Sequence, residues 1–261
     1  MSKNRALITG ASAGLGKEFA RQLAARGKDL VLVARRIEPM EELANRLREQ
    51  HGVDVDIIQA DLADPLAPAA IHAETVSRGL DIDTLINNAG AAGPDLLTVR
   101  DWDAQQAHLT LMMTSVAAMC HFFIPAMQGG GYGRVLNVAS VAGQITVPGD
   151  CNYGPTKTYL IALSKSLADT VKKDGVHVLA LCPGFTHTDF HQSEDLAKMK
   201  RGMPGFIWYD ADVVIREGLE ALERGRSVYT SGRLYRFLMP LLRTPLSRVV
   251  FRAIGVRFRK P

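Results

Sequence analysis

Cysteine is scarce in this sequence. The chain of 261 residues has three cysteines, Cys120, Cys151 and Cys182, at spacings that match no metal-ligand motif. A small, odd number of cysteines argues against a disulfide framework, and the lack of paired spacings argues against a zinc cluster. We therefore predict no metal site and expect a reducing compartment, the cytoplasm, as the location of the protein.

Long apolar runs are absent as well. No uninterrupted apolar stretch reaches the roughly 18 residues that a membrane-spanning helix needs. The N-terminal residues MSKNRALITG contain too short an apolar run for a signal peptide. The sequence shows no internal repeat, no low-complexity segment and no linker before the C-terminal tail. Length and composition predict one domain, which we place at residues 1–232.

Acidic residues are missing from residues 233–261, which hold eight basic side chains. The other residues carry 23 basic and 27 acidic side chains, so the net charge of +4 comes from the tail. Basic amphipathic segments can lie on an anionic membrane surface. The alternative is an arm that packs on another subunit and keeps its arginines in water. Nucleic-acid binding is not expected, because residues 1–232 are net negative and contain no binding motif.

Short apolar runs alternate with stretches of helical period along the chain. Several runs are apolar at nearly every position, as strands buried on both faces require. The alternation predicts an open, doubly wound parallel sheet of about seven strands, with helices on both faces. The expected strands are residues 6–10, 30–35, 55–61, 84–90, 134–140, 177–184 and 227–232.

The first turn between a strand and a helix reads TGASAGLG, with glycines at Gly10, Gly14 and Gly16. In this position the turn can bring backbone N–H groups and the positive end of the helix close to a pyrophosphate. A glycine-rich turn can also be only a tight connection. Its place at the first such turn of an alternating chain favours a dinucleotide site.

The end of the second expected strand reads VARR and contains Arg35 and Arg36. NAD sites place an acidic residue here for the ribose 2′-hydroxyl, whereas NADP sites use arginine for the 2′-phosphate. No carboxylate competes at this turn. We therefore predict that NADP(H) is preferred over NAD(H), although the arginines could also be the solvated start of a helix.

The stretch NYGPTK places Tyr153 four residues before Lys157, and Pro155 favours a helix start between them. Residues four apart lie on the same face of a helix, so the ammonium can approach the phenol. The pair is either a solvated contact or an acid whose pKa is tuned by a cation.

Together these motifs resemble the short-chain dehydrogenase/reductase family. TGASAGLG, the NNAG of residues 87–90, Ser140, the Tyr153 and Lys157 pair, and PGFTHT at residues 183–188 occur in the order and spacing of that family. The similarity covers about residues 5–232. It implies a single Rossmann-like domain, NAD(P)(H)-dependent interconversion of a carbonyl and an alcohol on a small molecule, and a homo-oligomer, either dimer or tetramer.

The resemblance also implies roles for single residues. Tyr153 would be the general acid or base, Ser140 would bind the substrate oxygen, and Lys157 would bind the nicotinamide ribose and lower the tyrosine pKa. Lowering a phenol pKa from about 10 to about 7.5 takes roughly 3.4 kcal/mol. One cation about 4 Å away supplies roughly 4 kcal/mol at an effective dielectric of 20. The expected cofactor contacts are Gly10, Ser12, Gly14, Leu15, Gly16, Arg35, Arg36, Asp61, Leu62, Asn88, Ala89, Gly90, Tyr153, Lys157, Pro183, Gly184 and Thr188.

One position departs from the family pattern. Many members have an asparagine that supports a water chain to the lysine, and counting back from Pro125 puts Met112 there. A thioether cannot replace an amide in that role. Thr110, Thr114 or Ser115 could substitute through a water, or the register could differ. A catalytically weak cofactor-binding sensor or scaffold of the same fold is therefore the alternative to an active enzyme.

The segment at residues 185–210 takes the place of the family's variable substrate lid. It contains Phe190, Met199, Met203, Phe206, Ile207 and Trp208. Such a lid favours a hydrophobic substrate. The same side chains could instead pack this segment onto the sheet.

Overall fold

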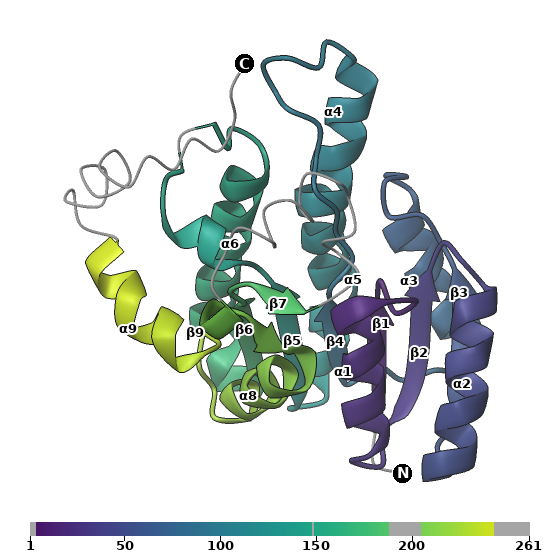
Figure 1. Cartoon of the computed structure of the whole chain (residues 1–261). Helices are drawn as coiled ribbons and strands as arrows, with labels where there is room; N and C mark the ends of the chain where they lie inside the picture. The colour runs from purple at the N-terminus through teal and green to yellow at the C-terminus, as the bar shows by residue number, and fades with distance from the viewer. Residues whose placement is uncertain (1–3, 148, 188–204, 243–261) are drawn as a thin grey trace.

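A computed structural model describes residues 4–147, 149–187 and 205–242 of the chain. Its centre is a sheet of seven parallel strands in the order β3-β2-β1-β4-β5-β6-β9 (Figure 1). All seven strands expected from the sequence are present, so the predicted fold class is confirmed. The strands are β1 (Arg5–Thr9), β2 (Asp29–Ala34), β3 (Val55–Gln59), β4 (Thr84–Asn87), β5 (Gly133–Val138), β6 (Val176–Cys182) and β9 (Val228–Thr230).

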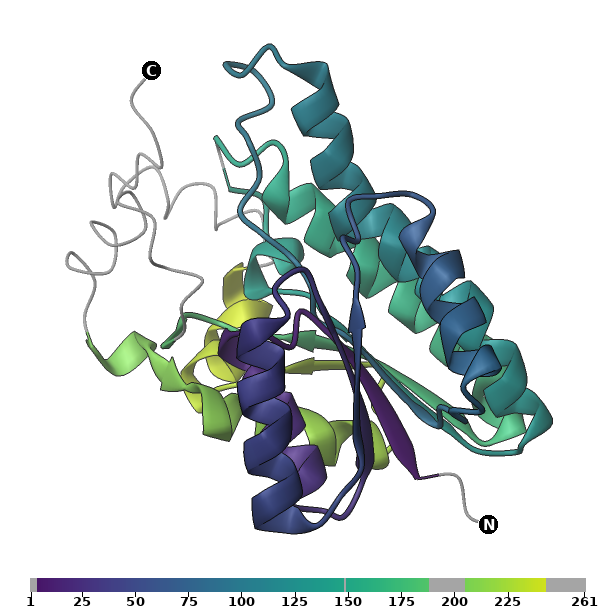
Figure 2. The same cartoon turned by 90° about the vertical axis from the view of Figure 1, so that its right-hand side faces the viewer.

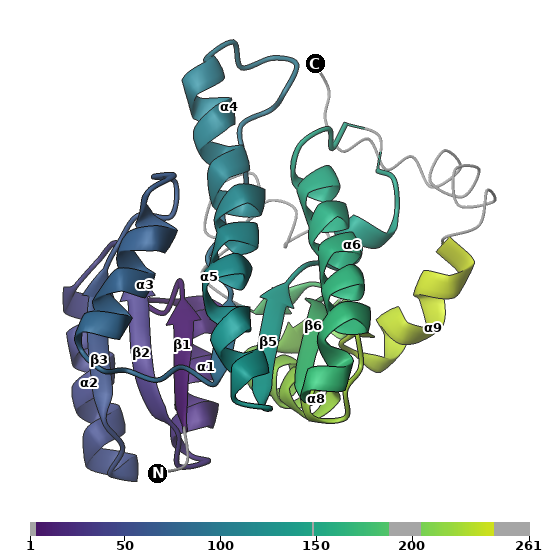
Figure 3. The same cartoon turned by 180° about the vertical axis from the view of Figure 1, so that it is seen from behind.

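The sheet is covered on both faces, which explains the apolar strands. Helices α1, α2 and α8 form one layer, and helices α3, α5 and α6 form the other (Figures 2 and 3). Apolar side chains of each strand alternate between two buried clusters, one under each layer. The helices are α1 (Gly14–Ala24), α2 (Glu38–His51), α3 (Ala67–Ser77), α4 (Trp102–Leu109), α5 (Ser115–Gly129), α6 (Tyr153–Val171), α8 (Ala211–Glu223) and α9 (Arg233–Leu242).

The strand order reverses direction beside β1. The chain runs from β1 outward to β3 and then returns to pair β4 with the other side of β1, with Ala6 opposite Thr84. In open α/β sheets this switch point leaves a crevice beyond the carboxyl ends of the strands, where ligands bind. The turns after β1, β4, β5 and β6 all reach this edge, and they carry the motifs found in the sequence.

The longest helical run, residues 102–129, joins α4 and α5 through a π-helical turn, η1 (Thr110–Thr114). Among the described residues it is long and apolar enough, by composition, to span a bilayer. Its apolar side chains, including Val116, Met119 and Phe123, belong to the buried cluster beneath α5. The α5 part therefore covers the sheet as a core helix, whereas α4 extends beyond the sheet (Figure 1).

The first ten residues of the predicted tail form α9. Its Tyr235 and Met239 are buried, whereas Phe237 is exposed. Arg236 pairs with Glu217 of α8 at 2.8 Å and donates to the hydroxyl of Tyr229 in β9. These contacts attach α9 to the edge of the sheet beside β9. Residues 243–261 of the predicted tail lie outside the described residues.

Candidate active site

A cavity of about 1040 Å³ lies over the carboxyl ends of the strands. It brings together the residues that the motifs singled out, from the glycine-rich turn to the loop after β6. Of the predicted contacts, Gly16 lies behind the lining, and Thr188 lies outside the described residues. Motifs more than 170 residues apart in the sequence thus share one wall, because parallel strands end at the same edge.

The turn after β1 requires glycine at two positions. Gly10 has a φ of 66°, and a Cβ there would lie 2.9 Å from the Cα of Ala89. A Cβ on Gly16 would lie 2.1 Å from the carbonyl oxygen of Gly10. The strand, the turn and the first turn of α1 therefore pack backbone against backbone. The sequence predicted a close approach of backbone to a ligand at this turn, and the structure adds a close approach of the chain to itself.

The segment after β4 braces this turn. The Asn88 side chain donates to the carbonyl of Thr9 at 2.9 Å, and the backbone N–H groups of Asn88 and Ala89 donate to the Thr9 hydroxyl at 3.0 Å. The NNAG motif thus has a structural function here, in addition to lining the cavity.

Two arginines lie at the end of the cavity beyond β2. The Arg36 guanidinium donates to the Ser12 hydroxyl at 3.3 Å, and Arg35 lies 3.7 Å from an Asp61 carboxylate oxygen. The Arg35 side chain is 74% exposed, so it can turn toward a bound anion. No carboxylate takes the position that would bind a ribose 2′-hydroxyl at the end of β2 itself, where the sequence reads VARR.

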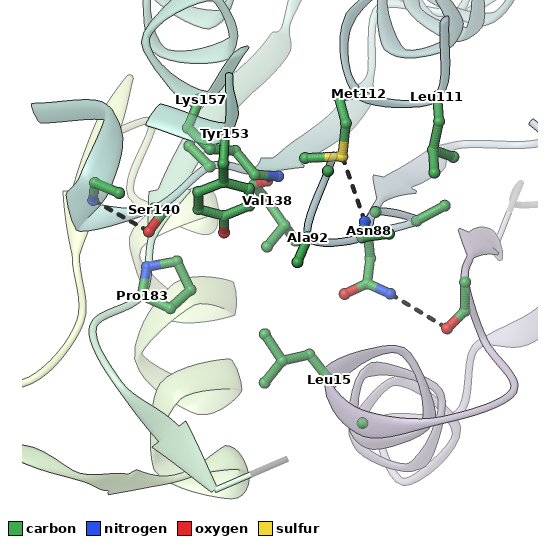
Figure 4. A pocket seen from close by; sticks show the side chains of 18 of the residues that line it. Leu15, Asn88, Ala92, Leu111, Met112, Val138, Ser140, Tyr153, Lys157 and Pro183 are labelled. Carbon is green, nitrogen blue, oxygen red and sulfur yellow. Dashed lines mark hydrogen bonds between the residues drawn. The ribbon is translucent and has the colours of Figure 1, made fainter. Parts of the chain in front are cut away.

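The opposite end of the cavity is formed by the start of α6 and the turn after β5. Tyr153 is the first residue of α6, so Lys157 follows one turn later on the same face. Ser140 follows β5 and hydrogen-bonds the Tyr153 hydroxyl. The Lys157 ammonium lies 5.6 Å from the centre of the Tyr153 ring and donates to the carbonyl of Val138 at 2.8 Å. Figure 4 shows Ser140 and Met112 on opposite sides of the Tyr153 ring.

The electrostatics of this end differ from the sequence-based expectation. Desolvation, together with the negative charge of Asp150, raises the pKa of Tyr153 to about 12, and the Ser140 hydrogen bond opposes that rise. Burial also lowers the pKa of Lys157 to about 8. The expected lowering of the tyrosine pKa by Lys157 is therefore wrong for the protein groups alone. Desolvation of the phenol is the largest cause of the shift, and the Lys157 ammonium donates to the Val138 carbonyl.

Met112 occupies the π-helical turn η1 and is 1% exposed. Its sulfur accepts from the backbone N–H of Ala91 at 3.4 Å. A Cβ on Gly90 would lie 3.2 Å from this sulfur and 3.8 Å from the Lys157 nitrogen, so Met112 lies next to the lysine. Single-turn π-helices are frequent at functional sites. The residue predicted to replace the family asparagine is thus at the site, with its sulfur on the cavity wall.

The loop after β6 closes the cavity. Pro183, Gly184 and Phe185 line it, and Phe185 packs on Trp208 with ring centres 5.1 Å apart. Trp208 is buried, whereas Phe206 is exposed. The lid residues Phe190, Met199 and Met203 lie outside the described residues.

Two residues at the site, Asp150 and Tyr235, were not predicted from the sequence. Asp150 lines the cavity three residues before Tyr153, where an acidic residue ahead of a helix start reads as an ordinary cap. Tyr235 of α9 accepts from the N–H of Phe185 at 3.2 Å and donates to the carbonyl of Ile207 at 2.8 Å. Nothing in the sequence links residue 235 to a loop some fifty residues earlier, because that contact depends on tertiary packing.

Comparison with known proteins identifies the family to which the chain belongs. The model of the family described as short chain dehydrogenase matches residues 4–198. The chain is 30% identical to 3-oxoacyl-acyl-carrier-protein reductase FabG of Staphylococcus aureus over 87% of its own length and 94% of that protein. Two solved structures are also similar. A short-chain dehydrogenase from Sphingobium yanoikuyae in complex with NADPH has a TM-score of 0.76, 28% identity and coverage of 98% and 97% of the two chains.

The second structure is the bulky-bulky ketone specific alcohol dehydrogenase from Comamonas testosteroni. It has a TM-score of 0.77 and 26% identity, with 98% of this chain and 95% of that chain covered. The fold, the motifs and these matches define the class: the chain belongs to the short-chain dehydrogenase/reductase family. It is an NAD(P)-dependent oxidoreductase of the kind that acts on carbonyl and alcohol groups.

Proposed function

We propose that the protein is an NADP(H)-dependent oxidoreductase that interconverts a carbonyl and an alcohol on a small apolar molecule, with Tyr153 as the general acid and base. The observation that carries the proposal is the grouping of Ser140, Tyr153 and Lys157 on one wall of the cavity, with a hydrogen bond between the two hydroxyls. Hydroxyl groups arranged in this way can bind a carbonyl oxygen and deliver a proton to it.

The residues of the cavity fit a nicotinamide dinucleotide. The turn after β1 leads into the N-terminus of α1 at Gly14, and Gly10 and Gly16 have no Cβ at positions where one would clash with the surrounding chain. When bound, the dinucleotide supplies or accepts the hydride. Ser140 then orients the substrate oxygen, Tyr153 holds the proton for it, and Lys157 binds the ribose next to the phenol. A raised tyrosine pKa keeps this proton on the phenol at neutral pH, which suits reduction.

The preference for NADP(H) rests on the two arginines after β2. Arg35 and Arg36 offer a pair of guanidinium groups to a 2′-phosphate, which they can bind through charge-assisted hydrogen bonds. The similar dehydrogenase from Sphingobium yanoikuyae was solved in complex with NADPH, which supports the same cofactor for this chain.

The apolar substrate rests on the lining of the catalytic end. The apolar side chains of Ala92, Leu96, Val141 and Ile145 line the same cavity as Ser140 and Tyr153. Relatives include a bulky-ketone-specific alcohol dehydrogenase and a ketoacyl reductase, so ketones of some size are the first substrates to test.

A second candidate, a catalytically weak sensor that binds NADP(H), is favoured by Met112. Its sulfur is a weak acceptor already engaged by the Ala91 N–H, so it offers little to a proton-conducting water chain. If this candidate is right, NADPH binds but turnover remains low, and Met112→Asn raises it.

The test is oxidation of NADPH and of NADH by the purified protein with a panel of ketones, aldehydes and quinones, with Ser140→Ala as the inactive control. Turnover that prefers NADPH and is lost in the control supports the enzyme. Tight NADPH binding without turnover on the whole panel supports the sensor. Homo-oligomerisation, a cytoplasmic location and membrane contact by the tail stay predictions.

A further inference from the structure

The two ends of the cavity carry opposite charges. Among the described lining residues, the end beyond β2 has Arg35 and Arg36, with Asp61 beside them. The catalytic end has the carboxylates of Asp95 and Asp150 and a single ammonium, that of Lys157. Lys157 is 5% exposed, and its ammonium donates to the carbonyl of Val138. Among the described residues, the catalytic end of the cavity therefore carries more negative than positive charge.

Asp150 is held in a defined place. It lies in the turn that leads into α6, and one of its carboxylate oxygens accepts from the backbone N–H of Gly154 at 2.9 Å. A Cβ on Gly154 would lie 2.8 Å from the same oxygen, so the carboxylate packs directly against the first turn of the helix that carries Tyr153. The side chain is half-buried and lines the cavity.

We propose that Asp150 is a specificity-determining residue that disfavours substrates with an anionic group next to the reacting carbonyl, so that the enzyme acts on neutral or cationic apolar carbonyl compounds. This inference rests on the proposed function, because it presumes that the carbonyl binds at Ser140 and Tyr153. A carboxylate on the carbon next to that carbonyl would enter the part of the cavity that Asp150 lines, where like charges repel across a partly desolvated space.

The effect of Asp150 on its neighbours supports its proximity to the reacting position. Its charge is among the causes that raise the pKa of Tyr153, after desolvation and alongside Cys182 of β6. It opposes the lowering of the pKa of His108 in α4, which burial and Lys157 produce. Among the described residues, the polar groups near the phenol are those of Ser140, Asp150, Lys157 and Cys182. Asp150 is the carboxylate in this set.

The experiment compares kcat/KM for a matched pair of probes, methyl benzoylformate and benzoylformate, which differ in the charge next to the ketone. The key variant is Asp150→Asn, because an asparagine oxygen can still accept from the Gly154 N–H and caps a helix as well as aspartate does. We expect the wild-type protein to favour the ester and Asp150→Asn to reduce the ester-to-acid ratio by about tenfold, which corresponds to 1.4 kcal/mol.

Two controls separate charge from structure. Asp150→Glu keeps the charge and should keep the preference for the ester. Asp95→Asn removes the other carboxylate of this end, whose oxygen accepts from the N–H groups of Leu97 and Thr98 in its own loop. It should change the ratio by less than about twofold, because a carboxylate held by two backbone donors is already partly compensated. The pH profile of kcat/KM separates a charge effect from a structural one. Because the charge of Asp150 raises the pKa of Tyr153, the alkaline limb of this profile should move to lower pH in Asp150→Asn, whereas loss of a purely structural contact would leave it in place.

A ratio in Asp150→Asn that equals the wild-type ratio, in a protein that unfolds at the same temperature, would overturn the proposal. If the wild-type protein reduces neither probe, dissociation constants of both probes for the NADPH-bound protein, read from NADPH fluorescence, replace kcat/KM in the same comparison. Lack of turnover then counts against the proposed function, whereas equal discrimination by wild type and variant counts against Asp150.

Discussion

The two ends of the cavity differ in the groups that line them and in how exposed these groups are. The end beyond β2 would receive the adenosine part of the proposed cofactor, and we call it the adenine end. It consists of backbone packed closely at glycines and of exposed arginines such as Arg35. At the catalytic end the chain offers buried side chains, with Lys157 and Met112 5% and 1% exposed. Interactions between solvent-exposed charges are weakened by screening. Desolvated groups interact more strongly, and desolvation also shifts their pKa values. Substitutions at the catalytic end should therefore have the larger effects on chemistry, and those at the adenine end should act mainly on cofactor affinity.

The sharpest test of this difference is Tyr153→Phe. Removal of the general acid should lower kcat by about 10³-fold, within the range known for such groups. The dissociation constant for NADPH should stay within about twofold, because cofactor affinity comes mostly from the other end. Stopped-flow hydride transfer and fluorescence titration measure the two quantities. An equal loss of both would mean that the two ends are not separable.

The pH dependence of the wild-type protein tests the same residue. In the proposed mechanism, reduction requires the protonated phenol of Tyr153, whose pKa burial raises to about 12. The rate of reduction should stay flat through neutral pH and fall only at alkaline pH, whereas the rate of oxidation should rise with pH. A fall in the reduction rate already at neutral pH would show that bound cofactor and Lys157 lower this pKa strongly.

At the adenine end, replacing both Arg35 and Arg36 with alanine should raise the KM for NADPH by about tenfold, the low end for hydrogen bonds to a charged group. The exposed position of Arg35 keeps the effect modest. The KM for NADH and the value of kcat should hardly change. Arg46→Ala, an exposed arginine on α2, is the control. If NADPH and NADH lose affinity equally, the arginines do not read the 2′-phosphate.

Gly16→Ala tests the backbone contacts at the same end. The new methyl group would lie 2.1 Å from the Gly10 oxygen, so the turn must shift. We expect a loss of about 1–3 kcal/mol in the free energy of unfolding, as overpacking usually costs, together with weaker NADPH binding. Gly129→Ala, at the end of α5, meets no other part of the described chain within 4 Å, so it should leave NADPH binding unchanged and should not lower the free energy of unfolding. Urea denaturation measures the difference.

The smallest expected effect is that of Tyr235→Phe. The variant keeps the ring against Gly184 but removes the hydroxyl that joins Phe185 and Ile207. We expect KM for the carbonyl substrate to rise by about fivefold, the equivalent of about 1 kcal/mol, while kcat changes little. Phe237→Ala, on the exposed side of the same helix, serves as control. An unchanged KM would mean that the loop holds its place without α9.

The features that could be predicted are those encoded locally. Continuous apolar runs identified the strands, and the glycines of TGASAGLG and the spacing of Tyr153 and Lys157 identified two walls of the cavity. The sign of the Tyr153 pKa shift could not be predicted, because it depends on how much water the folded site excludes. The spacing argument counted the Coulomb attraction of Lys157 and left out the desolvation of the phenol.

Residues that act through distant contacts also escaped prediction. Asp150 looks like an ordinary polar residue before a helix until the cavity beside it is known. The predicted boundary at residue 232 follows the change in charge pattern, and α9 begins directly after it. The buried ring of Tyr235 and the pairing of Arg236 with Glu217 arise from packing between elements far apart in the chain.

The hydroxyl of Tyr235 has a consequence for how the C-terminal helix and the cofactor pocket influence each other. Residues Pro183 to Phe185 line the pocket, and their position is coupled to the docking of α9 through that hydroxyl. Coupling of this kind is reciprocal: a ligand that favours the docked loop favours the docked helix by the same free energy. Whatever docks or releases α9 therefore changes the affinity of the pocket, and a filled pocket in turn favours the docked position of α9.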